Sequence, residues 1–158
     1  MGEAVQAHSP YRISLATIRD VHAIRRLEQV VFPLDAYSYL SLTGLLMWPG
    51  GINLKAGDSW GNIIGFVSGS PNWTTHIDWI VTLGVHPNHQ RQGLGYRLLT
   101  TCEENMSQPT LALTVRVSNG PAIHLYETAG YHRAYIEAHY YNDGEDGIVM
   151  QKQRNARH

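Results

Sequence analysis

Apolar and polar residues follow two different periods along the chain, and each period predicts a different kind of element. Residues 12–16 alternate with period two, which is typical of a half-buried strand. Residues 17–32 instead place apolar side chains three and four positions apart, so we expect a helix that ends before Pro33. Thr17 lies three residues before Asp20, as in a capping box at a helix start. The same reasoning predicts further helices at 37–48, 94–108 and 121–129, and strands at 52–56, 63–68, 76–86, 111–117, 131–141 and 147–152.

The order of these elements predicts one domain of the α+β class. Along the chain the order is βααβββαβαββ, which we interpret as a sandwich with one largely antiparallel sheet and helices on its faces. Turn-forming residues at 57–62 predict a hairpin, and Gly84 inside a strand predicts a bulge or a close approach of another segment. No internal repeat or low-complexity tract divides the sequence. We therefore expect a flexible leader at 1–10, a single domain at 11–153 and a tail at 154–158.

Composition argues against several other classes of protein. The chain has 158 residues, enough for one domain with a buried core, and its formal net charge of -1 argues against a general nucleic-acid binder. Cys102 is the only cysteine, and the nine histidines lack the spacing of metal ligands, so we expect neither an internal disulfide nor a metal. No apolar run is long enough to span a membrane, and the first ten residues do not resemble a signal peptide. These features favour a cytoplasmic protein that binds neither nucleic acid nor a membrane.

A polar loop between a predicted strand and a predicted helix holds the clearest candidate chemistry. Pro87 marks the end of the strand, because it cannot donate to a β-ladder. Gly93 and Gly95 remove two Cβ atoms where the helix begins, so a ligand can approach the unpaired N–H groups of its first turn. These groups suit an anion such as a pyrophosphate, and Arg91 and Arg97 add positive charge. The loop lacks the Gly-Lys-Ser/Thr end and the third glycine of two better-known phosphate loops.

Two motifs give this loop a more specific interpretation. Gln90-x-x-Gly93-x-Gly95, which follows Val85-His86-Pro87, resembles the pyrophosphate-binding signature of the GNAT acyltransferase superfamily. Residues 119–131 resemble the later motif of that superfamily, with an asparagine, an alanine, a Leu-Tyr pair and a Gly-aromatic exit in that order. The resemblance implies a GNAT-like three-layer sandwich that uses acetyl-CoA as co-substrate.

The resemblance also implies which residues contact acetyl-CoA. Backbone groups at the end of the strand are expected to hold the pantetheine chain, and N–H groups of the loop the pyrophosphate. An amide at position 119 can hydrogen-bond the pantetheine. The implied contacts are Leu83, Val85, Gln90, Arg91, Gln92, Gly93, Leu94, Gly95, Tyr96, Asn119, Ala122 and Tyr126.

Tyr126 is the predicted catalytic residue at the thioester. It follows Asn119 by two helical turns, so both side chains project toward one side if Asn119 lies near the helix start. In direct acetyl transfer an amine attacks the thioester carbonyl, and a thiolate with a pKa of about 8.5 leaves. A tyrosine with a pKa of about 10 can hydrogen-bond or protonate that sulfur. The alternative role for Tyr126 is that of a buried helix aromatic.

Further similarities concern the acceptor amine. Residues 113–119 and 145–150 resemble the RimI-type branch, whose members acetylate the N-terminus of a ribosomal protein, and its archaeal and eukaryotic relatives. In that branch an elbow and a tyrosine pair face the substrate peptide, since a peptide groove needs apolar walls and a few donors. Packing within the protein is the alternative explanation for these side chains. The implied peptide contacts are Phe32, Pro33, Leu34, Tyr140 and Tyr141.

The general base of that branch is missing from its position. Thr114 lies where RimI-type enzymes carry a glutamate, and threonine cannot accept a proton near neutral pH. Asp78 or His76, early in the strand that leads to Val85, could deprotonate the amine through water, and we predict Asp78. Alternatively no base is needed, because an N-terminal amine with a pKa of about 8 is partly neutral.

The sequence thus predicts an acetyl-CoA-dependent N-acetyltransferase whose acceptor is the N-terminal amine of a peptide or protein. A second hypothesis is acetylation of a small amine, a cation that an acidic turn with Asp143, Glu145 and Asp146 could receive. A third hypothesis is a non-catalytic acyl-CoA-binding sensor, which the missing base allows.

Overall fold

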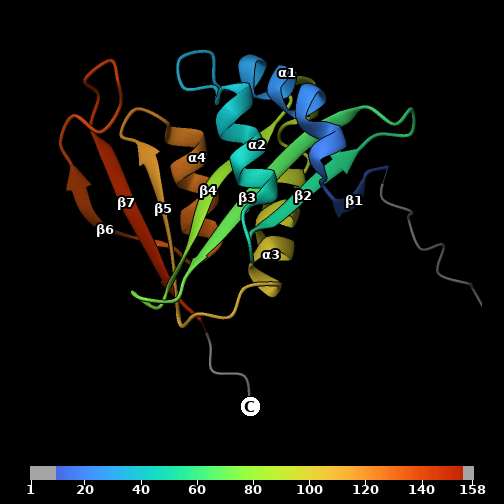
Figure 1. The fold of residues 1–158 in the computed structure, drawn as a ribbon. Coiled ribbons are helices and arrows are strands. Elements are labelled where there is room, and N and C mark those ends of the chain that lie inside the picture. Colours follow the sequence, from blue (N-terminus) through green and yellow to red (C-terminus); the bar gives the residue numbers. More distant parts are fainter. Residues whose placement is uncertain (1–9, 155–158) are drawn as a thin grey trace, which may run out of the picture.

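The computed structural model describes residues 10–154, which form one seven-stranded sheet with helices on both faces (Figure 1). The strand order across the sheet is β1-β2-β3-β4-β5-β7-β6. Neighbouring strands are antiparallel except β4 and β5, which run parallel. The predicted α+β sandwich with a largely antiparallel sheet is therefore confirmed. Of the predicted leader and tail, all but Pro10 and Arg154 lie outside the described residues.

The helices and strands follow the predicted order. Two short 3-10 turns, η1 (Ile18–Asp20) and η2 (Pro87–His89), precede α1 and α3. None of the helices described here is long and apolar enough to cross a membrane. The strands are β1 (Arg12–Leu15), β2 (Ile52–Gly57), β3 (Ile63–Asn72), β4 (Ile77–Val85), β5 (Thr110–Arg116), β6 (His132–Glu137) and β7 (Gly147–Gln153). The helices are α1 (Val21–Val31), α2 (Tyr39–Met47), α3 (Leu94–Glu104) and α4 (Gly120–Thr128).

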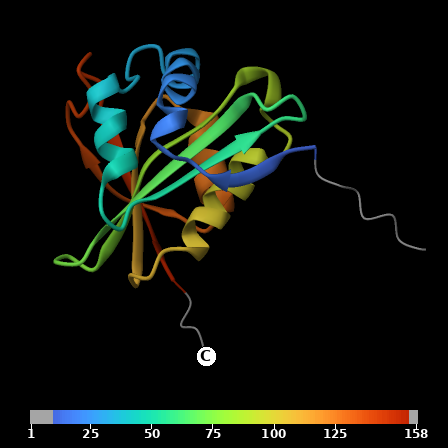
Figure 2. The same cartoon turned by 45° about the vertical axis from the view of Figure 1, so that its right-hand side comes forward.

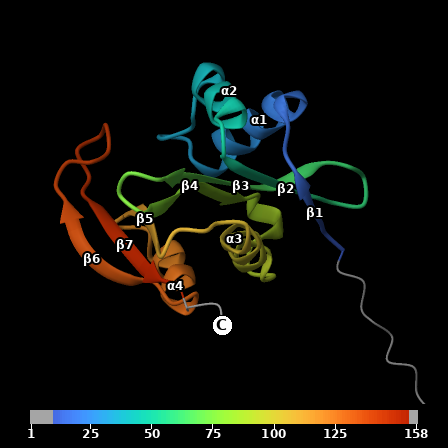
Figure 3. The ribbon, with the colours of Figure 1, turned by 60° about the horizontal axis from the view of Figure 1, so that its bottom comes forward.

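Helices cover the sheet on both faces, and each face has its own apolar core. α1 and α2 lie on one face, and α3 and α4 on the other (Figure 3). α3, the yellow helix in Figure 2, packs across β2, β3 and β4. Ile24, Leu42 and Phe66 are buried in the core beneath α1 and α2, and Leu98 and Leu99 in the core beneath α3. The sheet is therefore the middle layer of three.

The centre of the sheet opens between its two parallel strands. β4 pairs with β5 only from Ile77 to Trp79, and the two strands diverge beyond that point. β4 also contains a bulge, because Ser68 and Gly69 of β3 pair with Thr82 and Ile80 and leave the residue between them unpaired. The rest of β4 therefore has no strand on the side that faces β5.

Gly84 and the ends of β6 and β3 show which details of the strands were predicted correctly. A Cβ at Gly84 would lie 3.1 Å from Cε2 of Phe32, so the predicted close approach is confirmed, but the bulge lies at Val81 instead. The strand predicted to run to Tyr141 ends at Glu137, because His139 adopts a left-handed φ of 53° and the chain turns there. β3 in turn extends to Asn72, four residues beyond its prediction.

Candidate active site

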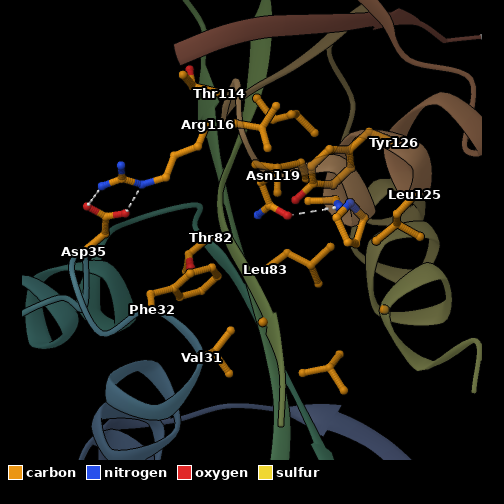
Figure 4. Close-up of a pocket in the computed structure, with 18 of the residues that line it drawn as sticks. Val31, Phe32, Asp35, Thr82, Leu83, Thr114, Arg116, Asn119, Leu125 and Tyr126 are labelled. Atoms are coloured by element: carbon orange, nitrogen blue, oxygen red, sulfur yellow. Dashed lines mark hydrogen bonds and ion pairs between the residues drawn. The ribbon is translucent and has the colours of Figure 1, made fainter. Parts of the chain in front are cut away.

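A cavity of about 710 Å³ lies where β4 and β5 separate (Figure 4). Its lining comes from both faces of the sheet. The end of α1 and the segment after it contribute on one side, and the β4–α3 loop and α4 on the other. The cavity therefore passes between two strands, and ligands that approach from opposite faces can meet in it.

The β4–α3 loop depends on two residues with left-handed backbone. Arg91 has a φ of 61°, and Gly93, the N-cap of α3, has a φ of 79°. A Cβ at Gly93 would meet no atom within 4 Å, so backbone conformation and not space favours glycine there. The Gln90 side chain donates from Nε2 to the Val85 carbonyl at 2.9 Å and ties the loop to its strand. The loop thus brings the positive N-terminal end of α3 to the cavity, which suits an anionic ligand.

Most residues predicted to contact acetyl-CoA line this cavity. Gln92 and Leu94 do not, because Leu94 is buried in the core and the Gln92 carboxamide contacts the Tyr11 hydroxyl. Only the backbone of these two residues remains for the predicted role. The members of the predicted set that line the cavity are Leu83, Val85, Gln90, Arg91, Gly93, Gly95, Tyr96, Asn119, Ala122 and Tyr126.

α4 begins beside this loop with its own polar cap. Asn119 is the N-cap residue, and its Oδ1 accepts a hydrogen bond from the Ala122 N–H at 3.2 Å (Figure 4). The oxygen of the amide is therefore used by the helix, and the NH2 group is the part that can serve a ligand carbonyl. A Cβ at Gly95 would lie 3.4 Å from Cδ2 of Leu125, so a side chain larger than alanine would push α3 and α4 apart.

Tyr126 projects from α4 into the cavity (Figure 4). Burial raises the pKa of its phenol to about 12, so the hydroxyl keeps its proton through the physiological range. Its ring packs edge-on against Tyr131 with the two centroids 6.0 Å apart. A protonated, oriented phenol can donate a hydrogen bond or a proton, but it cannot act as a base at neutral pH.

The structure places Asp78, the predicted general base, away from the cavity. Its side chain is fully buried, and Oδ2 accepts hydrogen bonds from the N–H groups of Ser107 at 3.0 Å and Gln108 at 2.9 Å. These contacts use Oδ2 to hold the segment after α3, while Oδ1 is buried without a hydrogen-bond partner among the described residues, and Asp78 does not line the cavity. His76, the other candidate, is exposed in the turn before β4 and does not line the cavity either.

A different carboxylate, that of Glu28 on α1, lines the cavity. It is only 2% exposed, and its Oε1 accepts a hydrogen bond from the Thr82 hydroxyl at 2.9 Å. Burial raises the pKa of Glu28 to about 7, although the Thr82 hydrogen bond opposes the shift. Within the described residues its Oε2 has no hydrogen-bond partner. The sequence carried a signal, because Glu28 lies between Ile24 and Val31 on the apolar stripe of a helix.

The predicted peptide contacts divide into two groups. Phe32, Tyr140 and Tyr141 line the cavity, but Pro33 and Leu34 do not, and Leu34 is 70% exposed. The elbow between α1 and α2, residues 32–38, points away from the cavity at these two positions and lines the cavity again from Asp35. Further lining residues on this side that the sequence did not identify are Glu28, Asp35, Tyr37, Trp79, Thr82 and Arg116.

Comparison with known proteins agrees with this geometry. The Acetyltransferase (GNAT) family matches residues 20–131, which is more than half of the chain. The chain belongs to the GNAT acetyltransferase family. Membership confirms the predicted acetyltransferase activity and acetyl-CoA as the co-substrate.

Relatives of this GNAT enzyme include several N-terminal acetyltransferases. The N-alpha-acetyltransferase of Sulfurisphaera tokodaii is 28% identical over 154 residues, which cover 89% of this chain and 91% of that protein. The catalytic subunit NAA10 of the N-terminal acetyltransferase A complex of Arabidopsis thaliana is 33% identical over 147 residues, covering 89% of this chain and 76% of that protein. The crystal structure of the ribosomal-protein-S18-alanine N-acetyltransferase from Escherichia coli superposes with a TM-score of 0.82 at 28% identity, over 94% of this chain and 96% of that one.

Thr114 has a packing role in this GNAT enzyme. It lines the cavity, but its Cγ2 would lie 2.7 Å from a Cβ at Gly147, and the Tyr140 side chain lies 3.2 Å from the same point. The threonine methyl and the tyrosine thus fill the space that glycine leaves at the start of β7. Thr114 therefore packs against the start of β7, and a threonine cannot act as a general base near neutral pH.

Proposed function

We propose that this GNAT acetyltransferase transfers the acetyl group of acetyl-CoA to the N-terminal amine of a peptide or protein. The observation that carries the proposal is the cavity that passes through the sheet, with the β4–α3 loop at one end and Glu28 at the other. Two relatives that align with 89% of the chain are named N-alpha-acetyltransferase and catalytic subunit NAA10 of the N-terminal acetyltransferase A complex, which supports this acceptor. Acetyl-CoA supplies a thioester-activated acetyl group, and the loop, Asn119 and the end of β4 are suited to hold it.

Glu28 and Tyr126 divide the proton transfers between them. An N-terminal amine with a pKa of about 8 is largely protonated at neutral pH, and Glu28 accepts that proton. The free amine nitrogen then attacks the thioester carbonyl carbon, a C–N bond forms and the C–S bond breaks. Tyr126 donates its proton to the sulfur as it leaves, and the phenol regains one from the proton that the new amide nitrogen releases.

The second hypothesis, a small cationic acceptor, loses its main support. The acidic turn already binds a cation of the protein, because Asp143 and Glu145 both form ion pairs with Arg116. Asp146 accepts a hydrogen bond from the His139 N–H at 2.9 Å.

The sensor hypothesis rested on the missing base, and Glu28 is the base in our proposal. We also propose the cytoplasm as the place of reaction, since a lone cysteine suits a reducing compartment.

Acceptor profiling tests the proposed function. Thiol release from acetyl-CoA is measured with peptides that differ in their first two residues, with the same peptides blocked at the N-terminus, and with polyamine and aminoglycoside acceptors. We expect release with free peptides and none with blocked ones. Release only with the small amines, or with blocked peptides that contain lysine, would contradict the N-terminal acceptor.

A further inference from the structure

One arginine joins the two segments at the acceptor end of the cavity. The Arg116 guanidinium, at the end of β5, donates to the two carboxylate oxygens of Asp35 at 2.7 and 2.8 Å (Figure 4). Its Nη1 also donates to Asp143 at 2.9 and 3.0 Å and to Glu145 at 2.8 Å. The ring of Tyr141 covers the guanidinium, with its centroid 4.1 Å from Cζ. Three carboxylates and one aromatic ring thus share a single cation.

The three carboxylates come from two segments that are far apart in the sequence. The first lies in the elbow, residues 32–38, which brings Phe32 and Tyr37 to the cavity. The other two lie in the hairpin loop, residues 138–146, which brings Tyr140 to the opposite wall. No backbone hydrogen bond joins the elbow to the hairpin loop in the part of the chain that the structure describes. The arginine is therefore a main connection between the two walls.

We propose that Arg116 is a positioning residue that fixes the separation of the elbow and the hairpin loop and so determines affinity for the acceptor peptide. This rests on the proposed function, because it concerns the peptide acceptor. Arginine suits the task, since its planar group carries five N–H donors in a fixed fork, whereas lysine has three donors on one nitrogen. All of its side-chain hydrogen bonds go to the elbow and the hairpin loop. A role in binding acetyl-CoA is therefore not expected.

The first test separates binding from chemistry in steady-state kinetics with an acceptor peptide. Arg116→Lys and Asp35→Asn should each raise the peptide KM roughly tenfold, because charge-assisted hydrogen bonds are lost. The kcat and the KM for acetyl-CoA should stay at their wild-type values. Asp58→Asn is the matched control, because Asp58 also accepts hydrogen bonds in a turn, but in the β2–β3 turn outside the cavity. A fall in kcat without a change in peptide KM would overturn the positioning role.

The second test measures hydrogen exchange and needs no acceptor. Asp35→Asn should speed amide exchange in the hairpin loop, and Glu145→Gln should speed it in the elbow, although neither substitution lies in the segment that responds. Asp58→Asn should change neither. Unchanged exchange in both segments would overturn the connection through Arg116. Because exchange does not depend on acetyl transfer, this result stands even if profiling shows that the acceptor is not a peptide.

Discussion

The two ends of the cavity are built in different ways. The end proposed for acetyl-CoA is built around one continuous segment, the β4–α3 loop, with Asn119 added from α4, and the shape of the loop comes from backbone conformation at Arg91 and Gly93. The acceptor end is assembled from α1, the elbow, the end of β5 and the hairpin loop, and its chemistry lies in the side chains of Glu28 and Arg116. A local backbone motif leaves a pattern in the sequence, while a site assembled from distant side chains does not. Substitutions at the two ends should therefore have different effects, on the rate of transfer at one end and on acetyl-CoA affinity at the other.

The largest effect is expected for Glu28→Gln at the acceptor end. Loss of a general base costs about 10²- to 10⁴-fold in rate, so kcat/KM for the peptide should fall by that much. Acetyl-CoA affinity, measured by calorimetry, should not change, because Glu28 lies on the opposite side of the sheet from the β4–α3 loop. Asp78→Asn is the control: it should lower stability, because two N–H groups lose a charged partner, but leave kcat/KM unchanged. The reverse pattern would restore Asp78 as the base.

The burial of Glu28 should also make the free energy of unfolding depend on pH. Its pKa is raised from 4.5 to about 7, so the folded state holds this proton more tightly than the unfolded state does. The resulting contribution favours folding fully below pH 4.5 and is lost as pH rises through 7. Glu28→Gln does not titrate, so between pH 4.5 and 8 it should gain about 3 kcal/mol relative to wild type, at 1.36 kcal/mol per pKa unit. Denaturant unfolding measures this difference, and an equal pH dependence in both proteins would show that Glu28 has an ordinary pKa.

Tyr126→Phe should lower kcat by about 10- to 100-fold, a smaller effect than loss of the base, because the thiolate can also leave unprotonated. The dissociation constant for acetyl-CoA should stay close to that of wild type. Tyr131→Phe serves as the control, because Tyr131 is a buried tyrosine beside Tyr126 whose hydroxyl donates to Glu103 at 2.9 Å and does not line the cavity. Equal losses of kcat in the two variants would assign Tyr126 a packing role only.

The smallest effect is expected at the acetyl-CoA end. Gly93→Ala should weaken acetyl-CoA binding roughly tenfold, because a non-glycine residue in the left-handed region costs about 1–2 kcal/mol and the loop shifts to relieve it. Gly61→Ala is the matched control, because Gly61 has a φ of 82° and, like Gly93, has open space around its Cβ position. Both variants should lose similar stability, but only Gly93→Ala should lose affinity. Equal affinities would mean that the loop does not hold the co-substrate.

The difference between the two ends also explains which site residues could be predicted from the sequence. Gly93, Asn119 and Tyr126 lie in motifs whose neighbours in sequence are also neighbours in space, and all three line the cavity. The fold was predictable for a similar reason, since each helix and strand carries its own period. Asp78, in contrast, could be placed only from tertiary structure, and Glu28 stands out in the sequence as a charge on an apolar helix stripe but its position in the cavity does not.

The placement of Asp78 away from the cavity has a specific structural cause. Regular alternation along β4 would place Asp78 on the same face as Thr82, which contacts Glu28 beneath α1. The bulge at Val81 reverses the alternation, so Asp78 faces the segment after α3 instead. Leu34 lies outside the cavity lining for a different reason, because an apolar residue between two helices can face outward without any sign of this in the sequence pattern.

A crystal structure with a bisubstrate analogue, in which the sulfur of CoA is joined through an acetyl group to the N-terminal amine of a peptide, is the most direct test. We predict that the pyrophosphate lies on the β4–α3 loop and that the junction lies between the Tyr126 hydroxyl and the Glu28 carboxylate. The peptide should leave between the elbow and the hairpin loop. A junction that does not reach Glu28, or a peptide that leaves on the α3 side of the sheet, would contradict a site that passes through the sheet.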